Sequence, residues 1–275
     1  MSQAATIGVG PVANLGSQWV ALRALVSRQI WRTLRSPGKF IGIAMNPVVM
    51  VVVLGLIFKD AIRVPDGVSY PAYVVAGVAV QVGVAVLGPT AISAAIDRKT
   101  GLSLRSETMP IPSLLRSIAL ILADLAAALV ALLLVSGIGL LLGWRPAGGA
   151  VAFLGSLLLL ATFYAAMLAC ASFIGELIDN PETIEPVGAL LLVLFSFCST
   201  VFLPAEGMPG PIRAVAELNP ASIVATSIRQ SWGQATLVDP DSPLSIYATP
   251  LAWTFAIVLG VVFLTLTAIR QRRRR

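Results

Sequence analysis

The sequence has 275 residues, of which 57% are hydrophobic and only 12% charged, so it has too little polar surface to cover a soluble globule of this length. Its formal net charge of +6 comes from Lys and Arg at the edges of apolar runs, which favours anionic lipid headgroups as partners and excludes a nucleic-acid-binding face. The absence of His excludes imidazole general bases and His-ligated metal sites.

Residues 17–36 are predicted to form an amphipathic helix, because large apolar side chains recur there at three- and four-residue spacing while arginines share another face. The helix is expected to lie along the inner membrane surface. It serves either as a positively charged anchor or as a contact for a cytoplasmic partner. Arg23 falls near the apolar side, which snorkelling or a contact with another subunit would explain. The basic face carries Arg28, Arg32 and Arg35.

Six later stretches are apolar and long enough to cross about 30 Å of hydrocarbon. An even number of spans places both termini on one side of the membrane. We therefore assign residues 1–38 to a cytoplasmic tail with the amphipathic helix, and residues 39–275 to a six-helix membrane domain. The stretches fall near residues 40–58, 72–95, 115–142, 150–175, 187–203 and 248–269.

Positive charge accumulates on alternate loops of this arrangement. The side that holds the two termini carries 14 Lys and Arg residues and the other side carries five. The C-terminal tail alone holds Arg270 and the run from Arg272 to Arg275, directly after the last apolar stretch. Because Lys and Arg are retained in the cytoplasm, both termini are predicted to be cytoplasmic, in a multi-pass protein of the cell membrane.

The loop between the second and third spans, residues 96–114, combines a charged turn, a glycine that can end a helix and a Pro-x-Pro that precedes the next span. Such a loop can present one short helix at the membrane surface to a docked protein. Its candidate residues are Asp97, Arg98, Lys99, Gly101, Leu104, Arg105, Glu107, Pro110 and Pro112.

Asp124 is the one acid well inside a predicted span, which makes it a candidate functional residue. It either pairs with a basic group near the cytoplasmic interface or on a neighbouring helix, or it has a proton or substrate role. A structural pairing predicts that Asp124→Asn leaves transport largely intact. The acids Glu176, Asp179, Glu182 and Glu185 are interpreted as a solvated loop or a contact to a basic partner surface. Nothing in their spacing guarantees the converging oxygens of a metal site, and we predict none.

Residues 204–247, between the fifth and sixth spans, are predicted to return through one or two short helices on the outer side. Irregular backbone near the membrane is tolerated only where protein buries it or where it lines a wet cavity. Residues 221–232 form a helix whose apolar side is expected to dip into the outer interface. The candidate residues of this region are Pro204, Pro209, Asn219, Pro220 and Arg229.

These two segments, in a six-span chain with a basic amphipathic N-terminus, resemble the permease subunits of type-2 ATP-binding-cassette (ABC) exporters, in particular the daunorubicin-resistance-like group. The resemblance covers nearly the whole chain. Lys99–Thr100 is a departure, because the family often has an acidic pair before the glycine. The matching positions are Asp97–Arg98, Gly101, Leu104 and Pro110–Ile111–Pro112 in the first segment, and Pro204, Pro209, Asn219, Pro220 and Arg229 in the second.

The resemblance implies that a short helix around residues 98–108 couples this chain to a separate ABC ATPase, and that a second permease, identical or homologous, completes the path. The chain has no G-x-x-x-x-G-K-[ST] motif, so the partner ATPase would bind ATP and Mg, and this chain would bind no cofactor.

We therefore predict an all-α membrane protein that is not an enzyme, the permease subunit of an exporter of amphipathic, lipid-like or drug-like cargo. The alternative is an integral membrane lipid-modifying enzyme, which would normally cluster acids, bases or metal ligands in its membrane-proximal loops.

Overall fold

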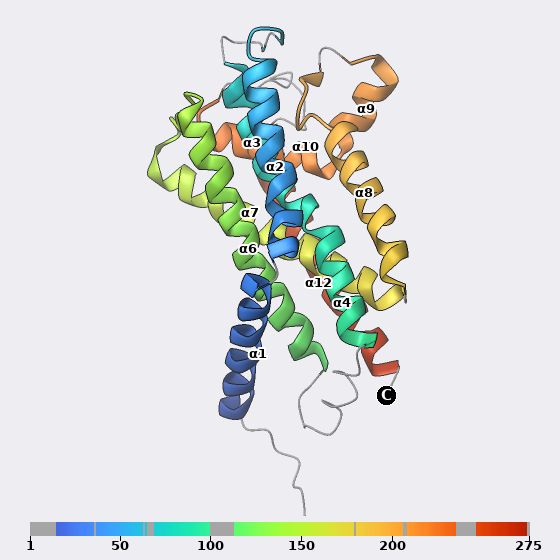
Figure 1. Ribbon diagram of the computed structural model, residues 1–275. Helices are drawn as coiled ribbons and strands as arrows, with labels where there is room; N and C mark the ends of the chain where they lie inside the picture. Colours follow the sequence, from blue (N-terminus) through green and yellow to red (C-terminus); the bar gives the residue numbers. More distant parts are fainter. Residues whose placement is uncertain are drawn as a thin grey trace, which may run out of the picture.

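All of the regular structure in the described part of the chain is helical, which confirms the predicted all-α class (Figure 1). The structure is a computed structural model that describes residues 15–35, 37–62, 64, 69–99, 113–178, 180–205, 208–234 and 246–273. The helices are α1 (Leu15–Arg35), α2 (Pro37–Ile57), α3 (Tyr70–Ala85), α4 (Leu87–Lys99), α6 (Ser113–Leu141), α7 (Gly149–Leu177), α8 (Pro181–Phe197), α9 (Gly210–Leu218), α10 (Pro220–Ser231) and α12 (Ala248–Arg273).

Five segments of the described chain are long and apolar enough to cross a membrane, judged by length and composition. They are α2, the continuous stretch of α3 and α4, α6, α7 and α12. Each overlaps one of the stretches predicted from the sequence. The amphipathic helix predicted at residues 17–36 is confirmed as α1, with no acidic residue and with Arg32 and Arg35 in its last turn.

The predicted fifth span differs most from the structure. The apolar stretch 187–203, predicted as this span, lies largely within α8 (Pro181–Phe197), which begins just after its cap residue Asn180 and ends six residues before the stretch does. Pro181 occupies the first turn, where its missing N–H is not needed, and Cys198 ends the helix. At 17 residues α8 is about 25 Å long, slightly short of the hydrocarbon thickness.

The chain must nevertheless run along the length of the bundle between the C-terminus of α7 and the N-terminus of α12, because these lie at opposite ends. The C-terminus of α7 lies beside the C-terminus of α12, where Arg270 Nε donates to the Glu176 carbonyl at 3.1 Å. The N-terminus of α12 lies beside α10, where Ser227 Oγ and Thr249 Oγ1 are 3.0 Å apart. Because α8 is the helix that leads from the first end to the second, the arrangement supports six passes, although α8 is the shortest of them (Figure 1).

Helix α3 is the centre of the bundle. It packs against α2, α6, α7, α8 and α10, and nearly every side chain between Tyr70 and Leu87 is buried. Small residues permit this close packing. A Cβ at Gly77 would lie 1.8 Å from the Val201 carbonyl oxygen, and one at Gly83 would meet the rings of Phe163 and Tyr164.

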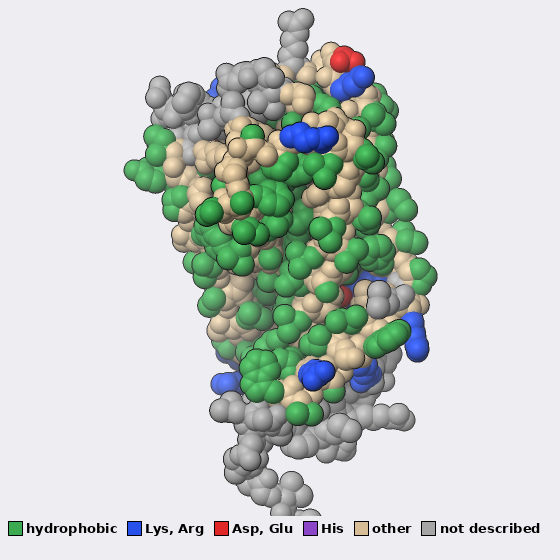
Figure 2. Space-filling view, turned by 90° about the vertical axis from the view of Figure 1, so that its left-hand side faces the viewer, with side chains coloured by type: hydrophobic (Ala, Val, Ile, Leu, Met, Phe, Trp, Pro, Cys, Tyr) green, Lys and Arg blue, Asp and Glu red, His purple; other side chains and the backbone are tan. Residues whose placement is uncertain are grey.

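The outer faces of the long helices are apolar. Figure 2 shows this on the side that carries α1, α6 and α7, where Lys and Arg lie mainly toward the two ends of the molecule. Leu133 and Val151 are among the most exposed side chains there. An apolar surface of this kind suits contact with lipid chains and not with water.

Candidate coupling end and buried polar sites

The last turn of α4 holds Asp97, Arg98 and Lys99, the described candidate residues of the predicted coupling loop. Arg98 donates to the carbonyls of Glu176 and Ile178, both at 2.8 Å, and so satisfies the C-terminus of α7. The final carbonyls of a helix have no partner within the helix, and a cation there also complements the helix dipole. Lys99 Nζ is 3.4 Å from Asn180 Oδ1, just before α8 begins.

Asp97 links α1 to the last turn of α4. Its carboxylate forms an ion pair with Arg32, which lies near the end of α1. The other two predicted arginines of α1 have different positions: Arg28 is exposed, and the Arg35 guanidinium lies 5.5 Å from the centre of the Trp31 ring. Arg32 is therefore the arginine that connects the amphipathic helix to the bundle.

The C-terminus of α12 joins this group through Gln271, whose Nε2 is 2.9 Å from both Ser117 Oγ on α6 and Glu176 Oε1 on α7. We call the end of the bundle where Arg32, Asp97, Arg98, Glu176 and Arg270 lie the basic end. Residues from α1, α4, α6, α7 and α12 meet there, and α4 and α6 are the helices that precede and follow residues 100–112 in the sequence. The sequence-predicted residues Gly101, Leu104, Arg105, Glu107, Pro110 and Pro112 lie outside the described residues.

The contacts of Arg98 lead to a first prediction. Arg98→Gln is expected to loosen the junction of α4 and α7 while the bundle stays folded, because the lost hydrogen bonds are only partly buried and each is worth about 1.5–3 kcal/mol at most. Hydrogen exchange around residues 174–178 should rise, with a small fall in melting temperature. Arg28→Gln, at an exposed position of α1, is the matched control and should change neither. Equal protection in the two variants would contradict the role given to Arg98.

Asp124 is buried within the bundle and paired. Its side chain is 0% exposed, and both carboxylate oxygens lie 2.7 Å from Nζ of Lys39, whose side chain is 13% exposed. Thr90 Oγ1 donates to the same carboxylate at 2.8 Å. The three residues come from α2, α4 and α6, so the ion pair ties three helices together. The expected basic partner exists, and it is a lysine of a neighbouring helix.

A second polar contact, between Gln81 and Asn46, joins residues that were not among the predicted candidates. Gln81 of α3 is buried and donates from Nε2 to Asn46 Oδ1 on α2 at 3.0 Å. Asn46 is itself exposed, in the apolar part of α2 that follows Lys39. The signal in the sequence was the presence of uncharged amides in two apolar runs, where polar side chains hydrogen-bond across helices.

Arg229 is the buried cation of the opposite end of the bundle. Its guanidinium stacks 3.7 Å above the centre of the Tyr73 ring, and Nη2 donates to the carbonyls of Thr200 and Val201, each at 3.1 Å. Tyr73 also donates from its hydroxyl to the Thr200 carbonyl at 2.5 Å. The irregular turn after α8 is thus held by α3 and α10, as backbone at membrane depth requires.

Asn219 and Pro220 form the start of α10. The Asn219 side chain accepts from the Ala221 amide at 2.9 Å and donates to the Cys198 carbonyl at 2.7 Å, so one residue caps α10 and satisfies the end of α8. Pro220 takes the first helical position, which suits its fixed φ. Pro204 is buried beside the turn, and Pro209 directly precedes α9.

The expectation that residues 221–232 dip into the outer interface is wrong. Helix α10 begins and ends one residue earlier than expected, and Val224, Ala225 and Ile228 are fully buried where the helix packs between α3, α7 and α12. Trp232 donates from Nε1 to Ser156 Oγ of α7 at 2.8 Å. Its small buried side chains, such as Ser222 and Ser227, permit the helix to pack closely inside the bundle.

Apolar helices of spanning length, packed around a buried central helix and closed at both ends by polar contacts, define a multi-pass α-helical membrane protein. The chain belongs to the ABC-2 type transporter family, whose model matches residues 20–232. It is similar to the daunorubicin resistance ABC transporter permease protein DrrB1 of Streptomyces coeruleorubidus, with 27% identity over 205 residues that cover 73% of this chain and 72% of the relative. The resemblance to permeases of type-2 ABC exporters is therefore confirmed, and it favours a transport subunit over an enzyme.

Proposed function

We propose that this chain works with a separate ABC ATPase, which docks on the basic end, to move amphipathic, lipid-like or drug-like cargo out of the cytoplasm or the inner leaflet. The observation that carries the proposal is the convergence of α1, α4, α6, α7 and α12 around Arg98 and Glu176 at the end of α4, the helix that precedes residues 100–112 in the sequence. The ATPase would bind the ATP and Mg, because this chain carries no phosphate-binding loop.

The contacts of the basic end connect the helices, so that a movement of one helix end would move the others. A displacement of segment 100–112 would act on the last turn of α4, from which Arg98 reaches the end of α7 and Asp97 reaches α1. Glu176 passes the same displacement to α12 through Arg270. Packed helices respond to such a push by rigid-body tilting, which would open a path between this subunit and a second permease, identical or homologous.

The proposed orientation follows from charge. The last turn of α1 and the C-terminus of α12 lie at the same end of the bundle, together with Arg98 and Lys99 (Figure 1). Positive charge is retained in the cytoplasm, so both termini are assigned there and the protein to the cell membrane. The turn after α8, with α9 and α10, then faces outward.

The nature of the cargo rests on two features. The relative is a permease whose name gives daunorubicin resistance, and the long helices offer apolar surface with the exposed neutral amide of Asn46 as a polar contact. Apolar walls with few polar groups select ligands by shape and hydrophobicity. An amphipathic drug or lipid therefore fits better than an ion or a sugar.

Co-purification with the cognate ATPase tests the proposal. We expect the wild-type chain to bind the ATPase and to stimulate ATP hydrolysis. Gly101→Pro should reduce stimulation at least tenfold, since a rigid φ and a missing N–H distort the coupling segment. Gly101→Ala is the milder control and should keep most of the stimulation. Unchanged assembly and unchanged stimulation in Gly101→Pro would refute the coupling role of this segment.

A further inference from the structure

We propose that the groove between α1 and α6 binds an anionic phospholipid of the inner leaflet, with its phosphate on Arg23 and an acyl chain against Leu122. Only the assignment to the inner leaflet rests on the proposed function. The groove has a volume of about 520 Å³ and is lined almost entirely by α1. This volume matches part of one lipid molecule and not a folded partner.

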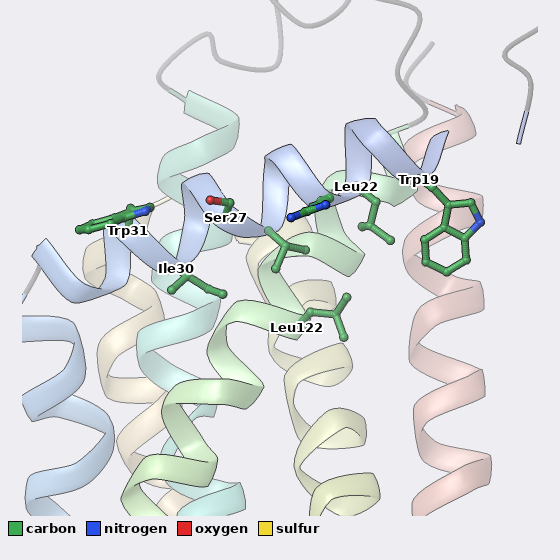
Figure 3. A pocket seen from close by; sticks show the side chains of 8 residues that line it. Trp19, Leu22, Ser27, Ile30, Trp31 and Leu122 are labelled. Atoms are coloured by element: carbon green, nitrogen blue, oxygen red, sulfur yellow. The ribbon is translucent and has the colours of Figure 1, made fainter. Parts of the chain in front are cut away.

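The lining of the groove combines apolar walls with one cation. Leu22, Val26 and Ile30 form the wall on α1, and Leu122 contributes from α6 (Figure 3). Arg23 lies within this lining, at the position near the apolar face that its spacing indicates. An acyl chain needs an apolar wall and a phosphate needs a cation, and the groove offers both.

Two tryptophans of α1 also line the groove, Trp19 and Trp31, and they are 70% and 59% exposed. Tryptophan concentrates at the level of the lipid headgroups because its ring is amphipathic. Leu122 is 41% exposed, and the exposed apolar face of α6 continues from it through Val130 and Leu133. A chain lying on Leu122 would therefore run on along α6 into the hydrocarbon.

Charge selects an anionic headgroup. Helix α1 contains no Asp or Glu, and in the described residues no carboxylate pairs with Arg23, whereas Arg32 is neutralised by Asp97. Each Lys or Arg near an anionic membrane surface contributes about 1 kcal/mol to binding, which corresponds to about fivefold in affinity. A soluble acidic peptide would not use the apolar continuation along α6, so the lipid is the better occupant.

Native mass spectrometry of the full chain tests the proposal, with phosphatidylglycerol and phosphatidylcholine of identical acyl chains as probes. We expect wild type to retain phosphatidylglycerol preferentially. Arg23→Gln should lower that retention about fivefold. Arg28→Gln removes a charge from the same helix outside the groove and should keep the preference. Ser27→Trp fills the groove without a change in charge and should lower retention of both lipids.

Three results would overturn the proposal: equal retention of the two lipids, equal losses in Arg23→Gln and Arg28→Gln, or displacement of the lipid by inorganic phosphate alone. Cross-linking of Ser27→Cys between two chains in native membranes would instead assign the groove to a second copy. The lipid measurement needs neither ATPase nor cargo. A negative lipid result would therefore not bear on the proposed transport function. Loss of ATPase coupling would likewise not bear on the proposed lipid site.

Discussion

Lys39→Met is expected to destabilise the protein by about 3–5 kcal/mol, because it leaves the carboxylate of Asp124 buried without a cation. Asp124 is 0% exposed, and Thr90 would be its remaining hydrogen-bond donor among the described contacts. Thermal unfolding in detergent, followed by circular dichroism, measures the effect. Lys59→Met is the matched control at the other end of α2, where Lys59 and Asp60 form an exposed pair at 3.8 Å, and it should change little.

The partner substitutions separate a structural role of Asp124 from a role in transport. Asp124→Leu combined with Lys39→Met removes both charges and should recover most of the stability, since an apolar pair of similar volume often replaces a buried ion pair without loss. Asp124→Asn should cost less than Lys39→Met, because Lys39 is partly exposed and its ammonium can turn toward water. It should also keep transport. A folded Asp124→Asn variant that assembles normally but exports nothing would show that the carboxylate itself has a proton or cargo role.

Arg229→Met is expected to destabilise the protein by about 3 kcal/mol, the scale of one or two lost hydrogen bonds to a charged group. The methionine can fill the space over the Tyr73 ring, but the Val201 carbonyl loses the Arg229 donor and the Thr200 carbonyl keeps only the Tyr73 hydroxyl among the described contacts. Arg229→Lys should be only partly tolerated, because one ammonium cannot both stack on a ring and reach two carbonyls in the geometry of a guanidinium.

The measurement is thermal unfolding together with limited proteolysis near residues 198–208, where the turn should open in the Arg229 variants. Arg213→Lys provides a matched control on α9, since Arg213 forms a partly exposed i,i+4 pair with Glu217. If Arg229→Lys melts at the same temperature as wild type, the stacking of Arg229 on Tyr73 and its hydrogen bonds to two carbonyls are not what holds the turn after α8.

The helices were largely predictable because their signals are local. Apolar runs of spanning length identified α2, α6, α7 and α12, and the arginine-bearing amphipathic pattern identified α1. The start of α10 at Pro220 also follows from local chemistry, since Asn219 caps the helix. In contrast, the end of α8 depends on the turn after it, which residues of α3 and α10 hold from far away in the sequence.

The partners of the charged residues could not be predicted. Asp124 and Arg229 were both selected as candidates, but Lys39 lies 85 positions from Asp124, and Tyr73 lies 156 positions from Arg229. Hydropathy likewise could not distinguish an interfacial α10 from a buried one. Its small polar residues suit either a wet surface or close packing against neighbouring helices, and only the arrangement of α3, α7 and α12 decides.

Cross-linking from position 99 tests most directly whether an ABC ATPase docks on the basic end and moves there when it binds ATP. A photoreactive group attached at Lys99→Cys should capture the co-purified ABC ATPase, with a yield that changes on addition of ATP and Mg. The same group at Lys59→Cys, which follows the C-terminus of α2 at the opposite end of the bundle, should capture none. Capture from Lys59 and not from Lys99, or full transport by the purified chain without any ATPase, would contradict the account.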